Sequence, residues 1–456
     1  MTPTLTPQTR VHLVGVGGAG MSGIARILLQ RGHAVSGSDL RDSRSLEELR
    51  VLGARVEVGH DPGNVGEADV VVISTAVPQG NAEVVAARQR GIAVVRRAEM
   101  LAQLMADDHA VLIAGTHGKT TTTSMAVVGI QAAGGDPSFA IGGSLNDSGT
   151  NAHAGTDGRF VAEADESDRS FLVFRPDLAV VTNLEHDHPE EFEDLASVRQ
   201  AFLGFLERRA PGAPAVLCVD DPPTAALADD VEPPVVTYGI DPRADIRTVT
   251  GEDGRHRLRV HGQDAVELAL GVPGRHNVLN ATAAMAVCHH LGIDLEQAAA
   301  GLTGFTGATR RFQRLGEAAG VTIVDDYAHH PTELRATLAA ARSTAPGRIV
   351  LVVQPHRYSR TATFGPELGR AASAADIVIV TEVYGAGETP VPGVTGHTVA
   401  AAAAASGAMV TYRPHLGDVL DELLEVVREG DLVLTTGAGD VTQVGPTLLG
   451  RLRNRR

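Results

Sequence analysis

AVLIAGTHGKTTTT, at residues 110–123, is the stretch that sets the architecture of this 456-residue chain. Its first five residues form an apolar run typical of a buried strand, and a helix-like stretch follows over residues 124–130. A strand, a glycine-rich turn and a helix form the context in which a phosphate loop works. Backbone N–H groups and the helix N-terminus face the anion, a lysine neutralises phosphate oxygens, and a threonine hydroxyl binds Mg²⁺. The stretch therefore predicts a nucleotide-phosphate site at Lys119 and Thr120.

The chain has 39 lysine and arginine residues in total. Lys119 is the only lysine among them, and all the others are arginine. A compact ammonium suits this position, and an arginine fork would not substitute well for it. The motif is shorter than the usual G-x-x-x-x-G-K-[ST], because Ile113 stands where the first glycine belongs and the nearest earlier glycine is Gly115. An ordinary loop that caps a helix is the alternative interpretation.

Composition limits the class of protein. At 456 residues the chain is too long for one compact domain, and about three are expected. The net charge of −16 argues against non-specific binding of nucleic acid or of an anionic membrane. Cys218 and Cys288 lie far apart and are predicted to be buried thiols. Residues 1–10 carry no apolar leader and no apolar run reaches membrane-spanning length, so we expect a cytoplasmic protein.

A second glycine-rich loop, GVGGAG over Gly15–Gly20, lies near the N-terminus. It follows a strand-like run at residues 11–14 and precedes a helix predicted over Met21–Arg31, and Asp39 follows the next predicted strand. Glycines let the backbone approach a pyrophosphate, so the loop suits NAD, FAD or a nucleotide-sugar diphosphate. A tight turn without a ligand is the alternative. Further strand and helix signals predict a Rossmann-type domain that ends near Asp107.

Two polar stretches follow predicted strands in the middle of the chain. Glu163–Asp168 holds four carboxylates in six positions, which suits Mg²⁺ opposite the phosphates, although a solvated acidic turn is the alternative. Asn183–His188 has two histidines flanking an aspartate, which indicates a metal or γ-phosphate contact or only surface residues. Residues 237–270 are predicted to form short antiparallel strands. Gly271–Asn280 is then expected to open a helix over Ala281–Leu291.

The last segment alternates strands with Ala-rich helices and predicts a third α/β domain with polar clusters at its strand ends. One such cluster follows the strand predicted over Ile349–Gln354. There His356, Arg357 and Arg360 form a compact cationic corner, in which an arginine fork can bind a carboxylate in bidentate fashion. A surface cluster paired with local acids is the alternative.

Nine stretches resemble, in the same order, the motifs of the Mur ligases of bacterial cell-wall synthesis. They are Gly15–Ser22, Gly115–Thr123, Glu163–Asp168, Asn183–His188, Gly274–Asn280, Arg310–Phe312, Asp325–Pro331, Gln354–Thr361 and Gly437–Asp440. The resemblance implies an α/β protein of three domains. These are a Rossmann-like domain that binds a UDP-sugar (1–107), a central P-loop-type ATPase domain with a mixed sheet (108–312), and a Rossmann-like C-terminal domain that holds the amino acid and completes the ATP site (313–456).

The resemblance also implies the reaction, and Gln354–Thr361 favours the alanine-adding member of the family. Such an enzyme uses ATP, with two Mg²⁺ ions expected, to phosphorylate the carboxylate of UDP-N-acetylmuramate. The amine of L-alanine attacks the acyl phosphate, and an amide, ADP and phosphate result. A carboxylate is a poor electrophile, and phosphoryl transfer stabilised by Mg²⁺ and a lysine activates it. We expect these two small molecules as partners, no nucleic acid or membrane, and a monomer or a homodimer.

Individual roles follow from the same resemblance. ATP and its phosphates are expected at Gly115, Thr116, His117, Gly118, Lys119, Thr120, Thr121, Asn280, Arg311, Asp325 and Tyr327. Mg²⁺ is expected at Thr120, Glu163 and His188. The UDP-sugar is expected at Gly15, Gly17, Gly18, Gly20, Ser38, Asp39, Ser74 and Thr75. Alanine and its carboxylate are expected at His356, Arg357 and Arg360. The implied catalytic residues are Lys119, His188, His356 and Arg357.

The chain departs from the family pattern in two places. Pro189-Glu190 follows Asp187-His188, where relatives often have Met or Leu and then Asp, and Pro189 is expected to shift the local backbone. No second lysine exists to form the carbamylated metal bridge of several relatives.

The main rival is a nicotinamide- or flavin-dependent oxidoreductase, which would leave Lys119, Glu163 and Arg311 unexplained. A nucleotide-binding regulator without chemistry is a third interpretation, and it would not need the cationic corner.

Overall fold

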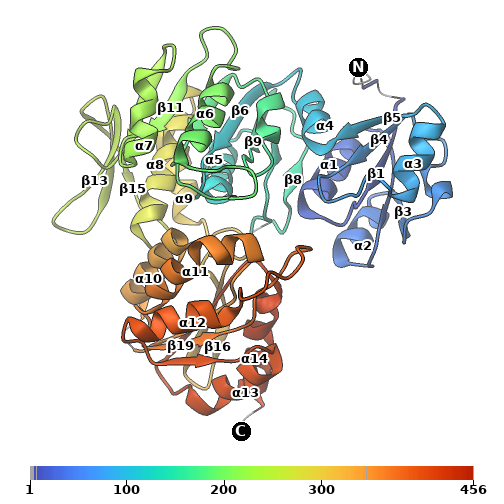
Figure 1. The fold of residues 1–456 in the computed structure, drawn as a ribbon. Coiled ribbons are helices and arrows are strands. Elements are labelled where there is room, and N and C mark those ends of the chain that lie inside the picture. Colours follow the sequence, from blue (N-terminus) through green and yellow to red (C-terminus); the bar gives the residue numbers. More distant parts are fainter. Residues whose placement is uncertain (1–4, 7, 147, 346, 455–456) are drawn as a thin grey trace. The chain divides into compact units, whose positions relative to one another are not determined.

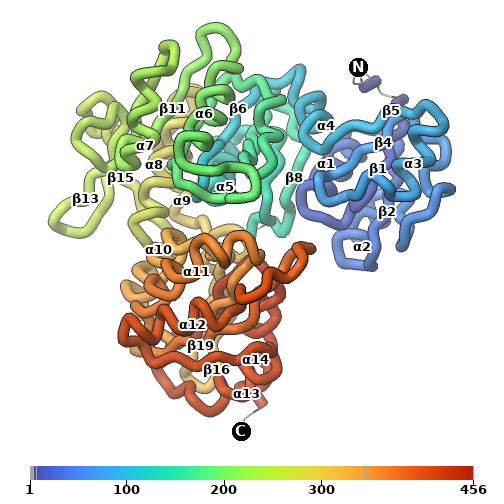
Figure 2. Tube along the Cα trace, in the orientation of Figure 1, coloured from blue at the N-terminus to red at the C-terminus, as the bar shows by residue number. Residues whose placement is uncertain are grey.

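The computed structural model describes residues 5–6, 8–146, 148–345 and 347–454. The chain forms two compact units. Unit 1 comprises residues 1–184, 196–269 and 280–304, and unit 2 comprises residues 185–195, 270–279 and 305–456. The first and last residues of the predicted domains, at positions 1–4 and 455–456, lie outside the described residues. Figure 2 traces the chain through a first sheet (blue), a second sheet (cyan to yellow) and a third sheet (orange and red).

The first sheet, in unit 1, has five parallel strands in the order β3-β2-β1-β4-β5 (Figure 1). Its strands are β1 (Arg10–Val14), β2 (Ala34–Asp39), β3 (Arg55–Val58), β4 (Val70–Ile73) and β5 (Ala93–Arg96). Its helices are α1 (Ala19–Gln30), α2 (Arg44–Val51), η1 (Pro62–Val65), α3 (Ala82–Gln89) and α4 (Arg97–Leu104). The strand order reverses between β1 and β4, so the loops after these strands open a crevice of the kind that binds ligands in α/β proteins. The predicted Rossmann-like fold is confirmed.

The second sheet, also in unit 1, has ten strands in the order β15-β14-β13-β12-β11-β10-β6-β9-β7-β8. Its strands are β6 (His109–Ala114), β7 (Ser138–Ala140), β8 (Ala152–His153), β9 (Arg159–Glu163), β10 (Leu178–Val181), β11 (Ala215–Cys218), β12 (Val235–Gly239), β13 (Ile246–Thr250), β14 (His256–Val260) and β15 (Gln263–Leu268). The helices of this part of the chain are α5 (Lys119–Ala132), η2 (Ser170–Val173), α6 (Leu195–Leu206), α7 (Pro222–Ala225), η3 (Ala226–Asp229), α8 (Arg275–His290) and α9 (Leu295–Thr303). The pairings from β13 to β7 are parallel, whereas β8, β14 and β15 pair antiparallel. The predicted mixed sheet is confirmed.

Two local predictions in this region were wrong in part. β12 pairs in parallel with β11 and β13, and only β13, β14 and β15 form the antiparallel arrangement expected over residues 237–270. Asp220 Oδ2 accepts hydrogen bonds from the backbone of Ile240 and Asp241, which bends the chain after β12 into a loop instead of a hairpin turn. Helix α8 begins at Arg275 and not near Ala281, directly after Gly274 with a φ of +100°.

The third sheet, in unit 2, has the order β16-β17-β21-β18-β19-β20, with β16 antiparallel at one edge and the other pairings parallel. Its strands are β16 (Gln313–Ala318), β17 (Val321–Asp326), β18 (Ile349–Val353), β19 (Ile377–Val380), β20 (Val410–Tyr412) and β21 (Leu432–Thr436). Its helices are α10 (Pro331–Thr344), α11 (Tyr358–Ala372), α12 (Gly396–Ala405), α13 (Leu416–Val426), η4 (Asp440–Gln443) and α14 (Val444–Arg453).

Alternate residues of β18 show how the third domain is layered. Ile349, Leu351 and Val353 pack with side chains of α10, α11 and α12 on one face. Val350 and Val352 pack with side chains of α13 and α14 on the other face. A fully apolar strand of this kind is expected where helices cover both faces of a parallel sheet. The predicted third α/β domain is confirmed.

Two predictions from composition can be compared with the structure. Cys218 and Cys288 are both free and buried, as predicted. Burial raises the pKa of the Cys218 thiol to about 11 and that of the Cys288 thiol to about 12. Among the helices of the described ranges, none combines the length and the apolar character that crossing a membrane requires.

Candidate functional site

A pocket of about 360 Å³ lies in unit 1 at the crevice of the first sheet. The loops after β1 and β4 line it, together with residues at and after the end of β9. Five residues predicted to bind the UDP-sugar are in its wall: Gly15, Gly18, Gly20, Ser74 and Thr75. Glu163, Asp165 and Asp168 of the acidic stretch line the same pocket, as does Arg97, a cation that sequence analysis missed. The fold therefore brings a glycine loop, an arginine and three carboxylates to one pocket.

Gly17, Ser38 and Asp39 support the glycine loop and are not in the pocket wall. Gly17 N donates to Asp39 Oδ2 at 2.9 Å, and a Cβ at Gly17 would lie 2.8 Å from Leu46 Cδ1. Ser38 is fully buried. In this structure the carboxylate of Asp39 accepts a hydrogen bond from the loop backbone, and its expected contact with the UDP-sugar stays a prediction.

The phosphate loop after β6 has the shape that its glycines predict. Gly115 has a φ of +140° and Gly118 a φ of +83°, conformations that favour glycine. A Cβ at Gly115 would overlap Thr182 Oγ1, and one at Gly118 would lie 2.6 Å from Asn280 Oδ1. Helix α5 begins at Lys119, directly after the loop, so its N-terminal N–H groups are next to the loop.

Lys119 is held in place by its own loop and by a buried carboxylate. Its Nζ donates to Gly115 O at 2.7 Å and to Glu166 Oε2 at 2.6 Å. Burial opposes the charged form, but Glu166 and Asp165 together raise the pKa of Lys119 above its usual value. The ammonium is therefore charged, and its hydrogen bonds hold it in a fixed position. Sequence analysis placed Glu166 in the acidic stretch but gave it no role of its own.

Thr120 and Glu163, the metal ligands expected from unit 1, lie side by side. Thr120 Oγ1 donates to Glu163 Oε2 at 3.1 Å, and Glu163 Oε1 accepts from Gly142 N at 2.7 Å. A hydroxyl and a carboxylate, with the Asp165 and Asp168 side chains in the same pocket, are the oxygen ligands that Mg²⁺ prefers. The residues present therefore fit a hard cation.

The end of β10 and helix α8 brace the phosphate loop. Asn183 accepts from His117 N at 2.8 Å through Oδ1 and donates to His117 O at 2.9 Å through Nδ2, while Thr116 N donates to Asn183 O at 3.0 Å. Thr122 Oγ1 donates to Asn280 Oδ1 at 3.2 Å. Asn280, a predicted ATP contact, thus lies beside the loop, and Thr121 is buried in the first turn of α5. Sequence analysis assigned no role to Asn183.

In unit 2, Asp325 is committed to an internal network at the end of β17. It is 1% exposed. Its Oδ1 accepts from Thr435 Oγ1 at 2.6 Å, and its Oδ2 accepts from Thr442 Oγ1 at 2.9 Å and from Arg310 Nε at 3.2 Å. In this structure both carboxylate oxygens of Asp325 thus accept hydrogen bonds from within unit 2, and its expected contact with ATP stays a prediction.

Arg311 and Tyr327, the other ATP contacts expected from this region, lie next to each other. The guanidinium carbons of Arg310 and Arg311 lie 5.0 Å and 4.9 Å from the centre of the Tyr327 ring, within cation–π range. Arg311 Nη1 is also 3.9 Å from Glu333 Oε1. A planar cationic and aromatic surface of this kind can take an adenine ring.

The predicted cationic corner contains a buried ion pair. Arg360 donates to Asp187 Oδ1 at 2.8 Å through Nε and to Oδ2 at 3.2 Å through Nη2, and both side chains are about 95% buried. Arg360 Nη1 is 3.2 Å from His356 Nδ1. Burial and the charges of His329, Arg360 and Arg357 lower the pKa of His356 to about 3, so its neutral ring can accept this bond. In this structure the guanidinium of Arg360 donates to Asp187, and its expected contact with the carboxylate of alanine stays a prediction.

Arg357 is more open, with 34% of its side chain exposed, and donates to Glu190 Oε1 at 2.7 Å. Arg357 and His188 have φ values of +64° and +54° although neither is glycine. His188 N donates to Asp187 Oδ1 at 2.7 Å, and its Nδ1 is 3.4 Å from Glu190 Oε1. Backbone strain of this kind gathers at functional sites.

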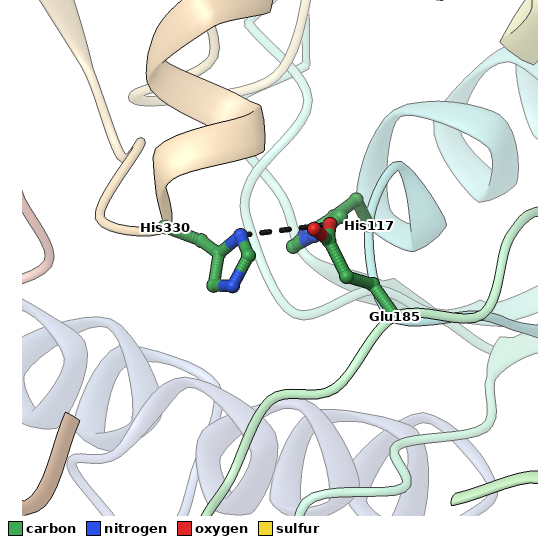
Figure 3. A group of neighbouring side chains, drawn as sticks. All are labelled: His117, Glu185 and His330. Atoms are coloured by element: carbon green, nitrogen blue, oxygen red, sulfur yellow. Dashed lines mark ion pairs between the residues drawn. The ribbon is translucent and has the colours of Figure 1, made fainter. Parts of the chain in front are cut away.

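The segment that carries His188 is tied to helix α10 as well. Glu185 Oε2 lies 3.6 Å from His330 Nδ1. Figure 3 marks this contact with a dashed line. Glu185 Oε1 accepts from Thr332 Oγ1 at 2.7 Å. Three acidic side chains of residues 185–195 thus bind the carboxyl-end loops and helices of the third sheet, which explains why this short segment belongs to unit 2.

Comparison with known proteins identifies the family. Three family models match the chain: "Mur ligase family, catalytic domain" at residues 10–109, "Mur ligase middle domain" at 113–288, and "Mur ligase, glutamate ligase domain" at 310–439. The chain belongs to the Mur ligase family.

This Mur ligase is similar to curated relatives over nearly its whole length. It is 51% identical to the UDP-N-acetylmuramate–L-alanine ligase of Acidothermus cellulolyticus, over 98% of this chain and 95% of the relative. It is 48% identical to the enzyme of the same name from Mycolicibacterium smegmatis, over 99% and 96%. The crystal structure of UDP-N-acetylmuramate-alanine ligase from Thermotoga maritima matches with a TM-score of 0.83 at 29% identity, over 98% of this chain and 100% of that one.

The site residues that sequence analysis missed in this Mur ligase are mostly partners of residues that it found. Glu166 holds Lys119 from 47 positions away, and Asp187 holds Arg360 from 173 positions away. Both lie inside recognised motifs, but their partners are set by the fold. A charged residue within a motif, next to a strand end, is the only local signal that could have singled them out.

Proposed function

We propose that this Mur ligase joins L-alanine to the carboxylate of UDP-N-acetylmuramate through an acyl phosphate, with conversion of ATP to ADP and phosphate. The names of the two curated relatives, matched over almost the whole chain, support this choice of substrates. The reaction serves peptidoglycan precursor synthesis, and we assign it to the cytoplasm, where ATP and UDP-sugars are available. The enzyme acts as a monomer or a homodimer.

One observation carries the proposal: a charged Lys119, held in a fixed position, follows the phosphate loop directly before Thr120, whose hydroxyl contacts the carboxylate of Glu163. Lys119 and the N–H groups at the start of α5 bind the phosphates of ATP. Charge that develops on the transferred phosphoryl group is stabilised best by groups that are already in place and need no reorganisation. The hydrogen bonds of Lys119 to Gly115 O and Glu166 supply this preorganisation.

Thr120 and Glu163 would hold one Mg²⁺ ion, and His188 would help to hold a second. When bound, Mg²⁺ supplies Lewis-acid stabilisation of the charge on the phosphoryl oxygens. Glu163 lines the pocket of the first sheet, which is where the sugar nucleotide is expected. Through its hydrogen bond with Thr120, Glu163 therefore connects the phosphate loop to the wall of this pocket.

Arg357 and His356 are the residues of unit 2 that we assign to L-alanine. The guanidinium of Arg357 is partly exposed and can exchange Glu190 for the carboxylate of the amino acid. The neutral ring of His356 adds no positive charge of its own next to the amine, which must lose its proton before it attacks. Arg360 acts on His356 through the bond to Nδ1.

We further propose that the three domains divide near residues 107 and 312. The five-stranded sheet ends at Arg96, the ten-stranded sheet lies between His109 and Leu268, and the third sheet begins at Gln313. Each sheet is thus complete within one of the segments 1–107, 108–312 and 313–456.

An omission assay tests the function. Purified protein is supplied with Mg²⁺, ATP, UDP-N-acetylmuramate and L-alanine, and phosphate release is followed while each component is left out in turn. We expect release only in the complete mixture, together with a new sugar nucleotide that is heavier by one alanine residue. Phosphate release that ignores the sugar nucleotide or the amino acid would contradict the proposal. Glycine and L-serine in place of L-alanine measure how strictly the amino acid is selected.

A further inference from the structure

Glu83, in the first turn of α3, is a buried carboxylate that the proposed chemistry does not use. Its side chain is 0% exposed. Its Oε2 accepts from Ser38 Oγ at 2.6 Å and lies 3.1 Å from His60 Nδ1. Its Oε1 accepts from Asn64 Nδ2 at 2.6 Å, and His12 Nε2 is 3.7 Å from Oε2. One carboxylate thus joins β1, β2, the turn after β3, and η1.

The environment keeps Glu83 ionised. Burial by itself would favour the neutral acid, but the nearby ring of His12 and the hydrogen bonds from Ser38 and Asn64 lower the pKa of Glu83 to about 2. A buried carboxylate is costly unless its oxygens are fully hydrogen-bonded. The network is therefore built around a fixed acceptor that determines how its donors point.

Ser38 links this network to the glycine-rich loop. Its hydroxyl points to Glu83, and its backbone oxygen accepts from Gly15 N at 2.8 Å and from Val16 N at 2.9 Å. The next residue, Asp39, accepts from Gly17 N through its side chain at 2.9 Å. The first turn of the loop is therefore hydrogen-bonded to the end of β2.

A second connection runs through Asn64. Its Nδ2 donates to Glu83 Oε1 and also to Gly59 O at 3.1 Å, and Gly59 N donates to Asp39 O at 2.7 Å. Glu83 therefore holds the end of β2 in two ways, directly at Ser38 and through Asn64 and Gly59 at Asp39. Ser38 and Asp39 are the two residues that bind the loop backbone. Gly15 lines the pocket, so a shift of this pair would move the pocket wall.

We infer that Glu83 is a positioning residue for the sugar-nucleotide pocket, which through Ser38 holds the Gly15–Gly20 loop in the shape that a diphosphate needs. The identity of the ligand rests on the proposed function. The inference gives Ser38 a different role from direct ligand contact, since its hydroxyl is buried against Glu83 and His60.

Three variants test this role. Glu83→Gln removes the charge with almost no change of shape, and Ser38→Ala removes the link while the strand backbone stays intact. Ser36→Ala is the matched control. Ser36 lies on the same strand and the same face, two residues earlier, and its hydroxyl contacts His12 Nδ1 at 2.9 Å and not Glu83.

Calorimetric titration with UDP-N-acetylmuramate gives the dissociation constant for each variant. We expect Glu83→Gln and Ser38→Ala each to raise it about tenfold, as the loss of one hydrogen bond to a charged group does. The KM for ATP should not change, and Ser36→Ala should bind as the unmodified protein does. The double variant Glu83→Gln/Ser38→Ala should be no worse than either single variant, because both act through one link. Additive effects, or an effect of Ser38→Ala alone, would instead indicate direct ligand contact and would overturn the inference.

Hydrogen exchange on the unliganded full-length chain provides a readout that needs no substrate. Amides of residues 15–20 should exchange faster in Glu83→Gln and Ser38→Ala, and at the unmodified rate in Ser36→Ala. If the unmodified protein does not bind UDP-N-acetylmuramate, the proposed function fails while exchange still decides the positioning role. Unchanged exchange in a folded Ser38→Ala protein would overturn it, even if Glu83→Gln did not fold.

Discussion

At the scale of single residues, the candidate site depends on charges that are buried in pairs. Lys119 pairs with Glu166, and Arg360 pairs with Asp187. Removing two charges from water is costly, and their attraction offsets this only when the geometry is good. The 2.6 Å contact of Lys119 and the bidentate contact of Arg360 meet that condition. Removing one partner of a buried pair should therefore lower the stability of the protein more than removing one partner of a surface pair.

Lys119→Arg and Lys119→Met should both lower the rate of phosphate release by at least about a hundredfold, the effect of removing one preorganised charged donor. Arginine should not rescue the activity, because the compact ammonium lies 2.7 Å from Gly115 O and 2.6 Å from Glu166 Oε2, and a planar guanidinium would not reproduce both contacts. Binding of UDP-N-acetylmuramate, measured by calorimetry, serves as the control and should be retained. Normal turnover in either variant would exclude Lys119 from phosphoryl transfer.

Asp187→Asn should lower the free energy of unfolding of unit 2 by about 3 kcal/mol, because it leaves the buried Arg360 without its counter-charge. Glu190→Gln is the matched control. It breaks the half-exposed pair with Arg357 and should cost less than about 1 kcal/mol. Urea-dependent hydrogen exchange of amides in β18 and β21 measures both values. Equal costs for the two variants would mean that the Arg360 pair contributes no more than a surface contact.

His329 makes unit 2 sensitive to acid. Burial lowers the pKa of His329 to about 4, below the value of about 6.5 expected in the unfolded chain. The fold therefore favours the neutral ring, and its contribution is fully present above pH 6.5 and is lost as the pH falls toward 4. His356 and His276 act in the same direction, while Asp326, whose pKa burial raises to about 6, acts in the opposite one.

We expect unit 2 to be less stable at pH 5 than at pH 7, with His329 contributing on the order of 2 kcal/mol. His329→Asn should reduce the difference, since an amide can replace the donor to Tyr327 O without taking up a proton. Urea unfolding followed at both pH values provides the measurement. An unchanged pH dependence in His329→Asn would assign the effect to other groups.

At the scale of elements, each part of the site lies where a parallel strand ends and a loop begins. The loop after β1 is supported by β2, the loop after β6 by β10, and His356 follows β18. Helix α8 adds Asn280 from within its second turn, which brings a side chain against the phosphate loop. Neighbouring elements, and not the loops alone, determine the loop shapes.

Gly118→Ala should abolish ATP-dependent turnover and destabilise unit 1. The residue has a φ of +83°, and the added Cβ would lie 2.6 Å from Asn280 Oδ1, so both backbone strain and a close contact arise. Gly134→Ala is an exact match in backbone angle, with the same φ of +83° and no atom within 4 Å of the added Cβ. It should cost about 1 kcal/mol and leave turnover unchanged. Phosphate release and thermal unfolding compare the two, and equal activity would remove the close contact from the explanation.

At the scale of the whole molecule, three sheets carry the three sets of residues on which the proposed reaction depends. The sugar-nucleotide pocket and the phosphate loop are both complete within unit 1, whereas the residues assigned to the amino acid belong to unit 2. UDP-N-acetylmuramate should therefore act on unit 1 and L-alanine on unit 2.

UDP-N-acetylmuramate alone should slow hydrogen exchange in unit 1, in particular at residues 15–20, 74–75 and 140–142, because these residues line the pocket. Exchange at residues 354–361 of unit 2 should stay as it is. UDP in place of the full ligand should protect residues 15–20, and it tests whether the diphosphate is the part that the loop binds. Protection centred on residues 354–361 would contradict the assignment of the pocket.

Much of the fold was predictable because the signals are local. Apolar runs such as Val70–Ile73 form buried strands, and the glycines at 15 and 115 stand where the backbone needs a positive φ. The start of α8 was predicted several residues too late, because Arg275 to Asn280 contains polar residues that resemble a cap. In the structure α8 begins at Arg275, and Asn280 lies within it with its side chain accepting a hydrogen bond from Thr122 of α5.

The sequence by itself determined the three α/β domains, both glycine loops and the family. Strand and helix periodicity, turn glycines and the order of motifs, which carry this information, can all be read along the chain. Tertiary structure alone decided which charges meet. It paired Glu166 with Lys119 and Asp187 with Arg360, and it brought Glu83 to Ser38, which binds the glycine loop. A buried charge is costly without a partner, and the fold determines which partner is near. That pairing also decided that the Arg360 fork faces a protein carboxylate, which no pattern of adjacent residues could show.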